Sequence, residues 1–95
     1  MELNVEWYRF IISGHVQGVF YRKSISQALM QKQFKGYTQN LEDGIVEVIA
    51  EIFDDDFDTF INILEDGSPL SKVESIKYEI IDDAQFNTDG FEIRY

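Results

Sequence analysis

The fold is decided where the chain reads Gly14-His15-Val16-Gln17-Gly18-Val19-Phe20-Tyr21-Arg22. An alternating apolar stretch at residues 6–13 precedes this run and predicts a strand, and an amphipathic stretch at residues 20–33 predicts a helix. Two glycines allow the backbone to turn tightly and to direct several N–H groups toward one point. The helix start adds unpaired N–H groups, and Arg22 adds a planar set of donors. Together these features predict a pocket for a small oxyanion.

Strand and helix patterns alternate through the rest of the chain. Five strands are predicted, at residues 6–13, 37–41, 45–52, 73–81 and 91–95. Glu42-Asp43-Gly44 is typical of a hairpin turn between the second and third strands. Acidic residues 54–56 favour the start of a second amphipathic helix and supply its N-cap, and Gly67 and Pro69 end that helix. A polar loop is expected from Asp82 to Gly90.

The order of these elements predicts the fold class. Strand, helix, strand, strand, helix and strand, followed by a short terminal strand, match an α+β, ferredoxin-like βαββαβ sandwich. Two layers are expected, with both helices on one face of an antiparallel-dominated sheet. A single domain over residues 1–95 fits the length, and an apolar content of 44% is enough for a core. Arg9 indicates that its face of the first strand, with Trp7 and Ile11, looks outward.

The amino-acid composition indicates the cellular compartment and excludes some classes of binding partner. The chain has no cysteine, which fits a reducing compartment, and no segment is long and apolar enough to be a membrane span. We therefore expect a cytoplasmic protein with no membrane partner. A net charge of -10 argues against nucleic acid as a partner, because phosphate backbones attract basic surfaces. A monomer is expected for a short chain of this charge.

Charge is divided unevenly along the chain. Residues 1–41 hold five basic and two acidic residues, a net charge of +3, whereas residues 42–95 hold three basic and sixteen acidic residues, a net charge of -13. The predicted oxyanion loop lies in the basic part. The acidic part is expected to form a solvated surface that keeps the protein soluble.

A second motif lies at a fixed distance from the first. Gly36-Tyr37-Thr38-Gln39-Asn40-Leu41-Glu42-Asp43-Gly44-Ile45-Val46-Glu47 places Asn40 at the end of the predicted second strand, eighteen residues after Arg22. With both motifs the chain resembles the acylphosphatase family. That family carries a G-x-V-Q-G-V-x-[FY]-R loop and then G-[FWY]-x-x-N-x-x-D-G-x-V-E at this separation. The run from Gly67 through Pro69 to Val73 also resembles the family's exit from its second helix.

This resemblance implies a reaction and a set of site residues. The reaction is hydrolysis of small-molecule acyl phosphates to a carboxylate and inorganic phosphate, with no metal, no cofactor and no phosphoenzyme. Arg22 corresponds to the family's phosphate-binding arginine and Asn40 to its water-orienting asparagine. The phosphate cradle corresponds to His15, Val16, Gln17, Gly18 and Val19. We expect Gln17 also to fasten the loop through side-chain hydrogen bonds, and His15 to be exposed.

Several positions depart from the family pattern without touching Arg22 or Asn40. Lys32-Gln33-Phe34 replaces the usual Leu-Gly-Leu turn before the second strand, and Ala50 stands where some members have glycine. Two further departures lie in or beside the motifs. Ile25 stands three residues after Arg22, where threonine is frequent in the family, so less polar support for Arg22 is expected. Thr38 stands where valine is common. Neither departure changes Arg22 or Asn40.

Two other functions fit parts of the sequence. One is a catalytically silent module of the same fold that binds phosphate or another anion; Asn40 argues against it, because an anion binder has no need to position a water. The other is an RNA-binding sheet, which requires exposed aromatic residues beside basic ones. Trp7 and Ile11 fit an outward face, but the net charge opposes this function.

Overall fold

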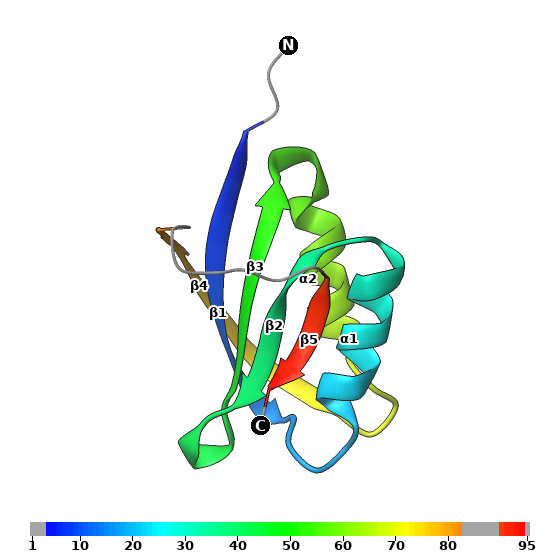
Figure 1. Cartoon of the computed structure of the whole chain (residues 1–95). Helices are drawn as coiled ribbons and strands as arrows, with labels where there is room; N and C mark the ends of the chain where they lie inside the picture. Colours follow the sequence, from blue (N-terminus) through cyan, green and yellow to red (C-terminus); the bar gives the residue numbers. More distant parts are fainter. Residues whose placement is uncertain (1–3, 83–89, 95) are drawn as a thin grey trace.

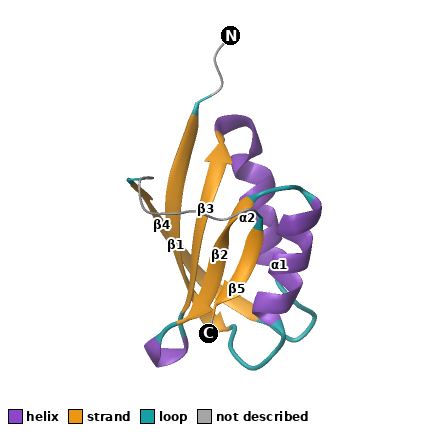
Figure 2. Cartoon of the chain, viewed as in Figure 1, coloured by secondary structure: helices purple, strands orange, loops and turns teal. Residues whose placement is uncertain are grey.

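Alternating apolar residues give the strands one buried face, and two helices cover that face. The computed structural model describes residues 4–82 and 90–94. In chain order its elements are β1 (Val5–His15), α1 (Tyr21–Gln31), β2 (Lys35–Asn40), the turn η1 (Glu42–Gly44), β3 (Val46–Phe53), the turn η2 (Asp54–Asp56), α2 (Phe57–Asp66), β4 (Lys72–Ile81) and β5 (Phe91–Arg94). Figures 1 and 2 show both helices on the same side of the sheet. The predicted two-layer ferredoxin-like sandwich is confirmed.

The strand order brings three strand ends to one end of the sheet. The order is β4-β1-β3-β2-β5, with β3 antiparallel to both β1 and β2, and with β5 parallel to β2. β1, β2 and β5 therefore run in the same direction and finish at the same end of the sheet, where Figure 1 also shows the chain entering α1. The run that follows β1, the residue Asn40 and the residue Arg94 all lie at this end.

The core lies between the sheet and the helices. Phe10 of β1 is paired with Val48 of β3, and both are fully buried. The Phe10 ring stacks on that of Phe60 from α2, with centroids 5.1 Å apart, while Ile25 and Leu29 bring the apolar stripe of α1 onto the same cluster. Burial of large apolar side chains is the main source of stability, and here it also fixes the start of α1 relative to the strand ends.

The opposite face of the sheet carries its own small cluster. Trp7 was expected to be exposed there, but it is only 7% exposed, because it packs against Tyr37, Ile49 and Ile81. Arg9 lies on this face and donates to Glu47 at 2.6 Å. The expectation of an exposed Trp7 is thus wrong, and the ring offers no surface on which a base could stack.

Several boundaries differ from the predicted ones for reasons of backbone geometry. α1 begins at Tyr21 because Phe20 has a left-handed conformation with φ of 62°, and it ends at Gln31 because Gln33 turns the chain with φ of 65°. Asp56 occupies the N-cap of α2 as predicted, but its side chain makes no capping hydrogen bond. Most of the predicted loop from Asp82 to Gly90 lies outside the described residues, as does residue 95.

Thr38 should limit the stability of the protein. It is fully buried on β2, and within the described residues its hydroxyl has no hydrogen-bond partner. A buried, unpaired polar group is costly, so Thr38→Val should raise the free energy of unfolding by about 1 kcal/mol. For a domain of this size the melting temperature should rise by roughly 4–8 °C, which calorimetry would measure.

Thr59→Val is the matched control, because Thr59 is exposed on α2. We expect it to change the free energy of unfolding by less than about 0.5 kcal/mol. A melting temperature for Thr38→Val equal to or below that of the unsubstituted protein would contradict the assignment of Thr38 as an unpaired buried group.

Candidate active site

Gly14 lies at a bulge in the strand ladder, just before the loop. The register between β1 and β4 shifts between Ser13 and Gly14, and Gly14 has φ of 129°. A Cβ atom added there would lie 2.2 Å from the Lys72 carbonyl oxygen. No side chain fits so close to a backbone atom, so only glycine allows the backbone to take this path at the bulge.

Two buried valines leave the backbone of the loop as its outward surface. Val16 is 1% and Val19 is 8% exposed, and both side chains belong to the main core. Gly18 lies between them in sequence with φ of 74°, and open space surrounds the position that its Cβ would take. The loop therefore turns its side chains inward and leaves room outside for a ligand to approach the backbone.

Gln17 fastens the loop to the hairpin that follows Asn40. Its amide nitrogen donates to the Leu41 carbonyl at 3.0 Å and to the Ile45 carbonyl at 2.8 Å. These carbonyls flank η1, which the Leu41 N–H closes by donating to the Ile45 carbonyl at 2.8 Å. The predicted fastening role of Gln17 is confirmed.

Ser68 fastens the other end of the loop, a role that sequence reasoning missed. Its buried hydroxyl donates to the Val19 carbonyl at 2.6 Å. Its own N–H donates to the Ser71 hydroxyl at 2.8 Å, and the preceding Gly67 passes so close to the Tyr21 ring that a Cβ atom would be 2.8 Å from it. In the sequence, the only indication of this role is a serine directly after the glycine that ends α2. Its hydrogen-bond partner lies 49 residues away, so no local sequence pattern predicts the contact.

Arg22 reaches from the second position of α1 toward β5. Its Nη1 donates to the Arg94 carbonyl at 3.1 Å. Ile25 is 1% exposed in the core, so it offers no polar support, as expected; the carbonyl at the end of β5 provides part of that support instead. Sequence reasoning did not find this contribution, because it comes from a main-chain atom of the last strand.

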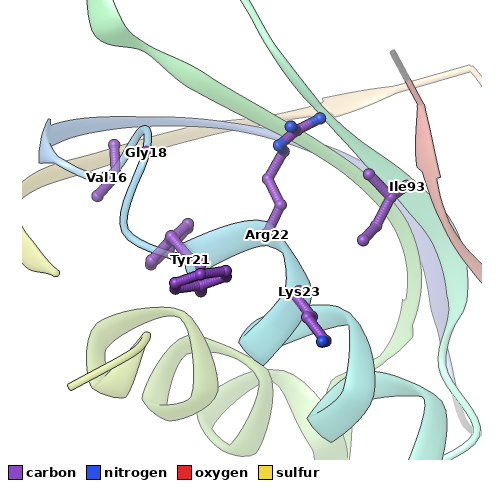
Figure 3. Close-up of a pocket in the computed structure, with 7 residues that line it drawn as sticks. Val16, Gly18, Tyr21, Arg22, Lys23 and Ile93 are labelled. Carbon is purple, nitrogen blue, oxygen red and sulfur yellow. The ribbon is translucent and has the colours of Figure 1, made fainter. Parts of the chain in front are cut away.

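A pocket of about 320 Å³ joins the loop to Arg22. Figure 3 shows the Arg22 side chain extending away from α1, with Ile93 of β5 nearby. The lining residues are Val16, Gly18, Phe20, Tyr21, Arg22, Lys23 and Ile93. The pocket thus combines loop backbone with two cationic side chains.

Tyr21 forms part of the pocket wall and has a structural role, not a chemical one. Its hydroxyl donates to the Leu64 carbonyl at 2.8 Å, and the ring is 1% exposed. Burial raises the pKa of the Tyr21 hydroxyl above its ordinary value, because the charged form would lose its hydration. The residue therefore stays neutral and fixes the start of α1 to α2.

The predicted cradle residues separate into distinct roles. Val16 and Gly18 line the pocket. Gln17 and Val19 instead attach the loop to the rest of the fold, Gln17 through its side-chain amide and Val19 through its carbonyl. His15 is exposed and is still paired with Lys72 in the β1–β4 ladder. His15, Gln17 and Val19 are therefore not among the residues that line the pocket.

Asn40 is the exposed last residue of β2 and is not part of the pocket lining. Two residues before it, Thr38 is paired with the pocket residue Ile93, and Asn40 itself is paired with the buried Val46. Because alternate residues of a strand share a face, Asn40 is on the helix-covered side of the sheet, the side of Arg22. Within the described residues its amide makes no side-chain hydrogen bond, and Leu41, directly after it, is held by Gln17.

Comparison with known proteins identifies the family. The family model described as Acylphosphatase matches residues 8–93, nearly the whole chain. The chain belongs to the acylphosphatase family. The acylphosphatase of Vibrio parahaemolyticus is 37% identical over 91 residues, covering 96% of this chain and 99% of that one. The acylphosphatase of Alkalilimnicola ehrlichii is 36% identical, covering 90% and 93% of the two chains.

A solved acylphosphatase structure shares the fold. The crystal structure of the Bacillus subtilis acylphosphatase superposes with a TM-score of 0.85 at 30% identity, covering 97% of this chain and all of that one. The predicted enzyme class, acylphosphatase, is thereby confirmed. Over residues 4–82 and 90–94, no helix is long and apolar enough to cross a membrane. Over the same ranges, no three His, Asp or Glu side chains gather as a group able to hold a metal ion.

The Ser68 hydrogen bond should carry a measurable part of the stability of the loop. Ser68→Ala leaves the Val19 carbonyl without its donor in a buried site, which should lower the free energy of unfolding by about 1–3 kcal/mol. Urea denaturation would measure this loss. Ser24→Ala on α1 is the control, because it keeps the backbone bond from the Ser24 N–H to the Phe20 carbonyl and should be within about 0.5 kcal/mol of neutral. Equal effects of the two variants would contradict a role of Ser68 in holding the loop.

Proposed function

We propose that this acylphosphatase hydrolyses the carboxyl–phosphate bond of small-molecule acyl phosphates without a metal or cofactor. In this proposal the 14–19 loop and Arg22 bind the phosphoryl group and Asn40 orients the attacking water. The observation that carries it is the pocket that places the loop backbone and Arg22 together at the strand end where β2 finishes with Asn40.

Binding would rely on fixed donors rather than on flexible side chains. The loop turns the side chains of Val16 and Val19 into the core, so a phosphoryl group would meet main-chain N–H groups and the guanidinium of Arg22. Charge-assisted hydrogen bonds from such donors are strong, and the arginine fork matches two phosphoryl oxygens at once. Phosphoryl transfer requires mainly that these groups be positioned and their charge be neutralised.

Asn40 would act on the water and not on its proton. An amide is no base at neutral pH, but its oxygen can accept from a water while its NH₂ donates to the water or to the substrate. The water oxygen then bonds to phosphorus in line, and the bond from phosphorus to the acyl oxygen breaks with its electron pair going to the carboxylate. The proton of the water passes to phosphate or solvent. A carboxylate is a good leaving group, so orientation supplies much of the remaining catalysis.

Hydrolysis of benzoyl phosphate by three variants tests the proposal. Arg22→Ala and Asn40→Ala should each lower kcat/KM by about 10²–10³-fold, the usual effect of removing one fixed donor to a transition state. Arg22→Lys should recover only part of the loss, because an ammonium keeps the charge but not the planar fork. Wild-type activity should persist in the presence of a metal chelator.

Asn62→Ala is the matched control, since Asn62 is exposed on α2, and it should leave turnover unchanged. Activity of Asn40→Ala equal to that of Asn62→Ala would refute the water-orienting role. A wild-type protein that binds inorganic phosphate but turns over no acyl phosphate would instead be the silent anion-binding module. Loss of activity on chelation would refute the metal-free reaction.

The proposal also includes a monomer in the cytoplasm with no nucleic-acid partner. A cysteine-free composition fits a reducing compartment, and a net charge of -10 opposes both self-association and the approach of polyanions. The burial of Trp7 removes the aromatic surface on which the RNA-binding alternative depended.

A further inference from the structure

Phe20 combines an unfavourable backbone conformation with an exposed ring. It is the N-cap of α1 at φ 62° and ψ 20°, a left-handed region that glycine adopts freely and phenylalanine rarely. Its side chain is 73% exposed and makes no capping hydrogen bond. Neither core packing nor capping therefore accounts for an aromatic residue here.

The neighbours of Phe20 explain its conformation but not its side chain. Val19 before it is buried, with its carbonyl held by Ser68, and Tyr21 after it is buried, with its hydroxyl held by Leu64. The Phe20 carbonyl also accepts the Ser24 N–H at 3.0 Å, which begins the helix. The backbone at position 20 turns between these fixed neighbours, and a glycine would adopt the same conformation with less strain. The fold by itself therefore gives no reason for an aromatic ring at this position.

The ring of Phe20 lines the same pocket as Arg22. The pocket of about 320 Å³ exceeds what a phosphate group alone would fill and lies in the range of small-ligand sites. Loop residues Val16 and Gly18 line one part of it, and Phe20, Lys23 and Ile93 add apolar wall and a cationic border. Figure 3 shows Ile93 projecting from β5 toward Arg22 and Lys23 on α1. An apolar surface thus adjoins the groups proposed to hold the phosphate.

We propose that Phe20 and Ile93 form an acyl subsite that favours acyl phosphates with an apolar, planar acyl group, benzoyl phosphate being the type. This inference rests on the proposed function and names its substrate class. A flat acyl group would stack on the Phe20 ring and contact Ile93, burying apolar surface that is exposed in the free enzyme. A small acyl group such as acetyl offers little apolar surface to either side chain. The subsite binds substrate and transition state alike, so its effect appears in KM.

The test compares two substrates that share the reacting group. Phe20→Ala should lower kcat/KM about tenfold for benzoyl phosphate, mainly through KM, and less than about twofold for acetyl phosphate. Phe20→Gly should show the same selective loss while raising the melting temperature, because glycine relieves the strained φ. Phe53→Ala, which removes another exposed phenylalanine away from this pocket, should change neither substrate.

Binding of two stable analogues separates this inference from the proposed reaction. Phenacylphosphonate and acetonylphosphonate carry CH₂ in place of the bridging oxygen of benzoyl and acetyl phosphate. Calorimetry should show that wild type prefers the phenacyl compound about tenfold and that Phe20→Ala loses this preference. An equal loss for both compounds, or no preference in wild type, overturns the subsite. An absence of hydrolysis together with an intact preference refutes the proposed function and leaves the subsite standing.

Discussion

Both halves of the site depend on the side-chain amide of Gln17. Its two hydrogen bonds, to the carbonyls of Leu41 and Ile45, join the loop after β1 to the turn after β2. Leu41 follows Asn40 directly, so the same amide that fixes the loop backbone also fixes the strand end that carries the asparagine. A single residue, Gln17, thus fixes the position of the loop backbone relative to Asn40, although Gln17 itself does not line the pocket. The proposed catalysis by positioning would require such rigidity, because a displacement of about 1 Å can cost 10²-fold in rate.

The topology separates acidic from basic residues in this acidic protein. β3 runs opposite to β1 and β2, so Asp54, Asp55 and Asp56, which follow β3, lie at the end of the sheet away from Arg22. Glu42 and Asp43 are at the near end, but they are exposed in η1, where water and salt screen them. Arg22 and Lys23 contribute to the pocket, and among the residues that the structure describes no acidic side chain does. The charged side chains that line the pocket are therefore opposite in sign to the net charge of the chain.

Local patterns predicted the elements, the two layers and the loop, because alternation, helical spacing and turn residues are properties of short segments. The same patterns could not predict what lies between distant segments. Ser68 on Val19 and the Arg94 carbonyl on Arg22 join residues far apart in sequence and involve main-chain acceptors, which leave no signature. Trp7 was misjudged for a related reason: its alternation placed it on the correct face, but only the pairing of the strands brings Tyr37 and Ile49 over it. The left-handed turn at Phe20 likewise follows from anchors on either side and not from its own preference.

The division between anchored and unanchored residues explains where specificity can arise. A carboxylate leaves readily, so acyl phosphate hydrolysis requires mainly a fixed phosphate site. In the loop, Val16 and Val19 are held by burial and Gln17 is held by hydrogen bonds to the hairpin. The acyl group does not require a fixed site of this kind, because its only part in the bond cleavage is that its carboxylate oxygen accepts the electron pair. Residues that face it are therefore free to be exposed and to differ in size without disturbing the chemistry. In the proposed subsite Phe20 fits this description, since its backbone lies between two anchored neighbours while its ring contributes nothing to the core.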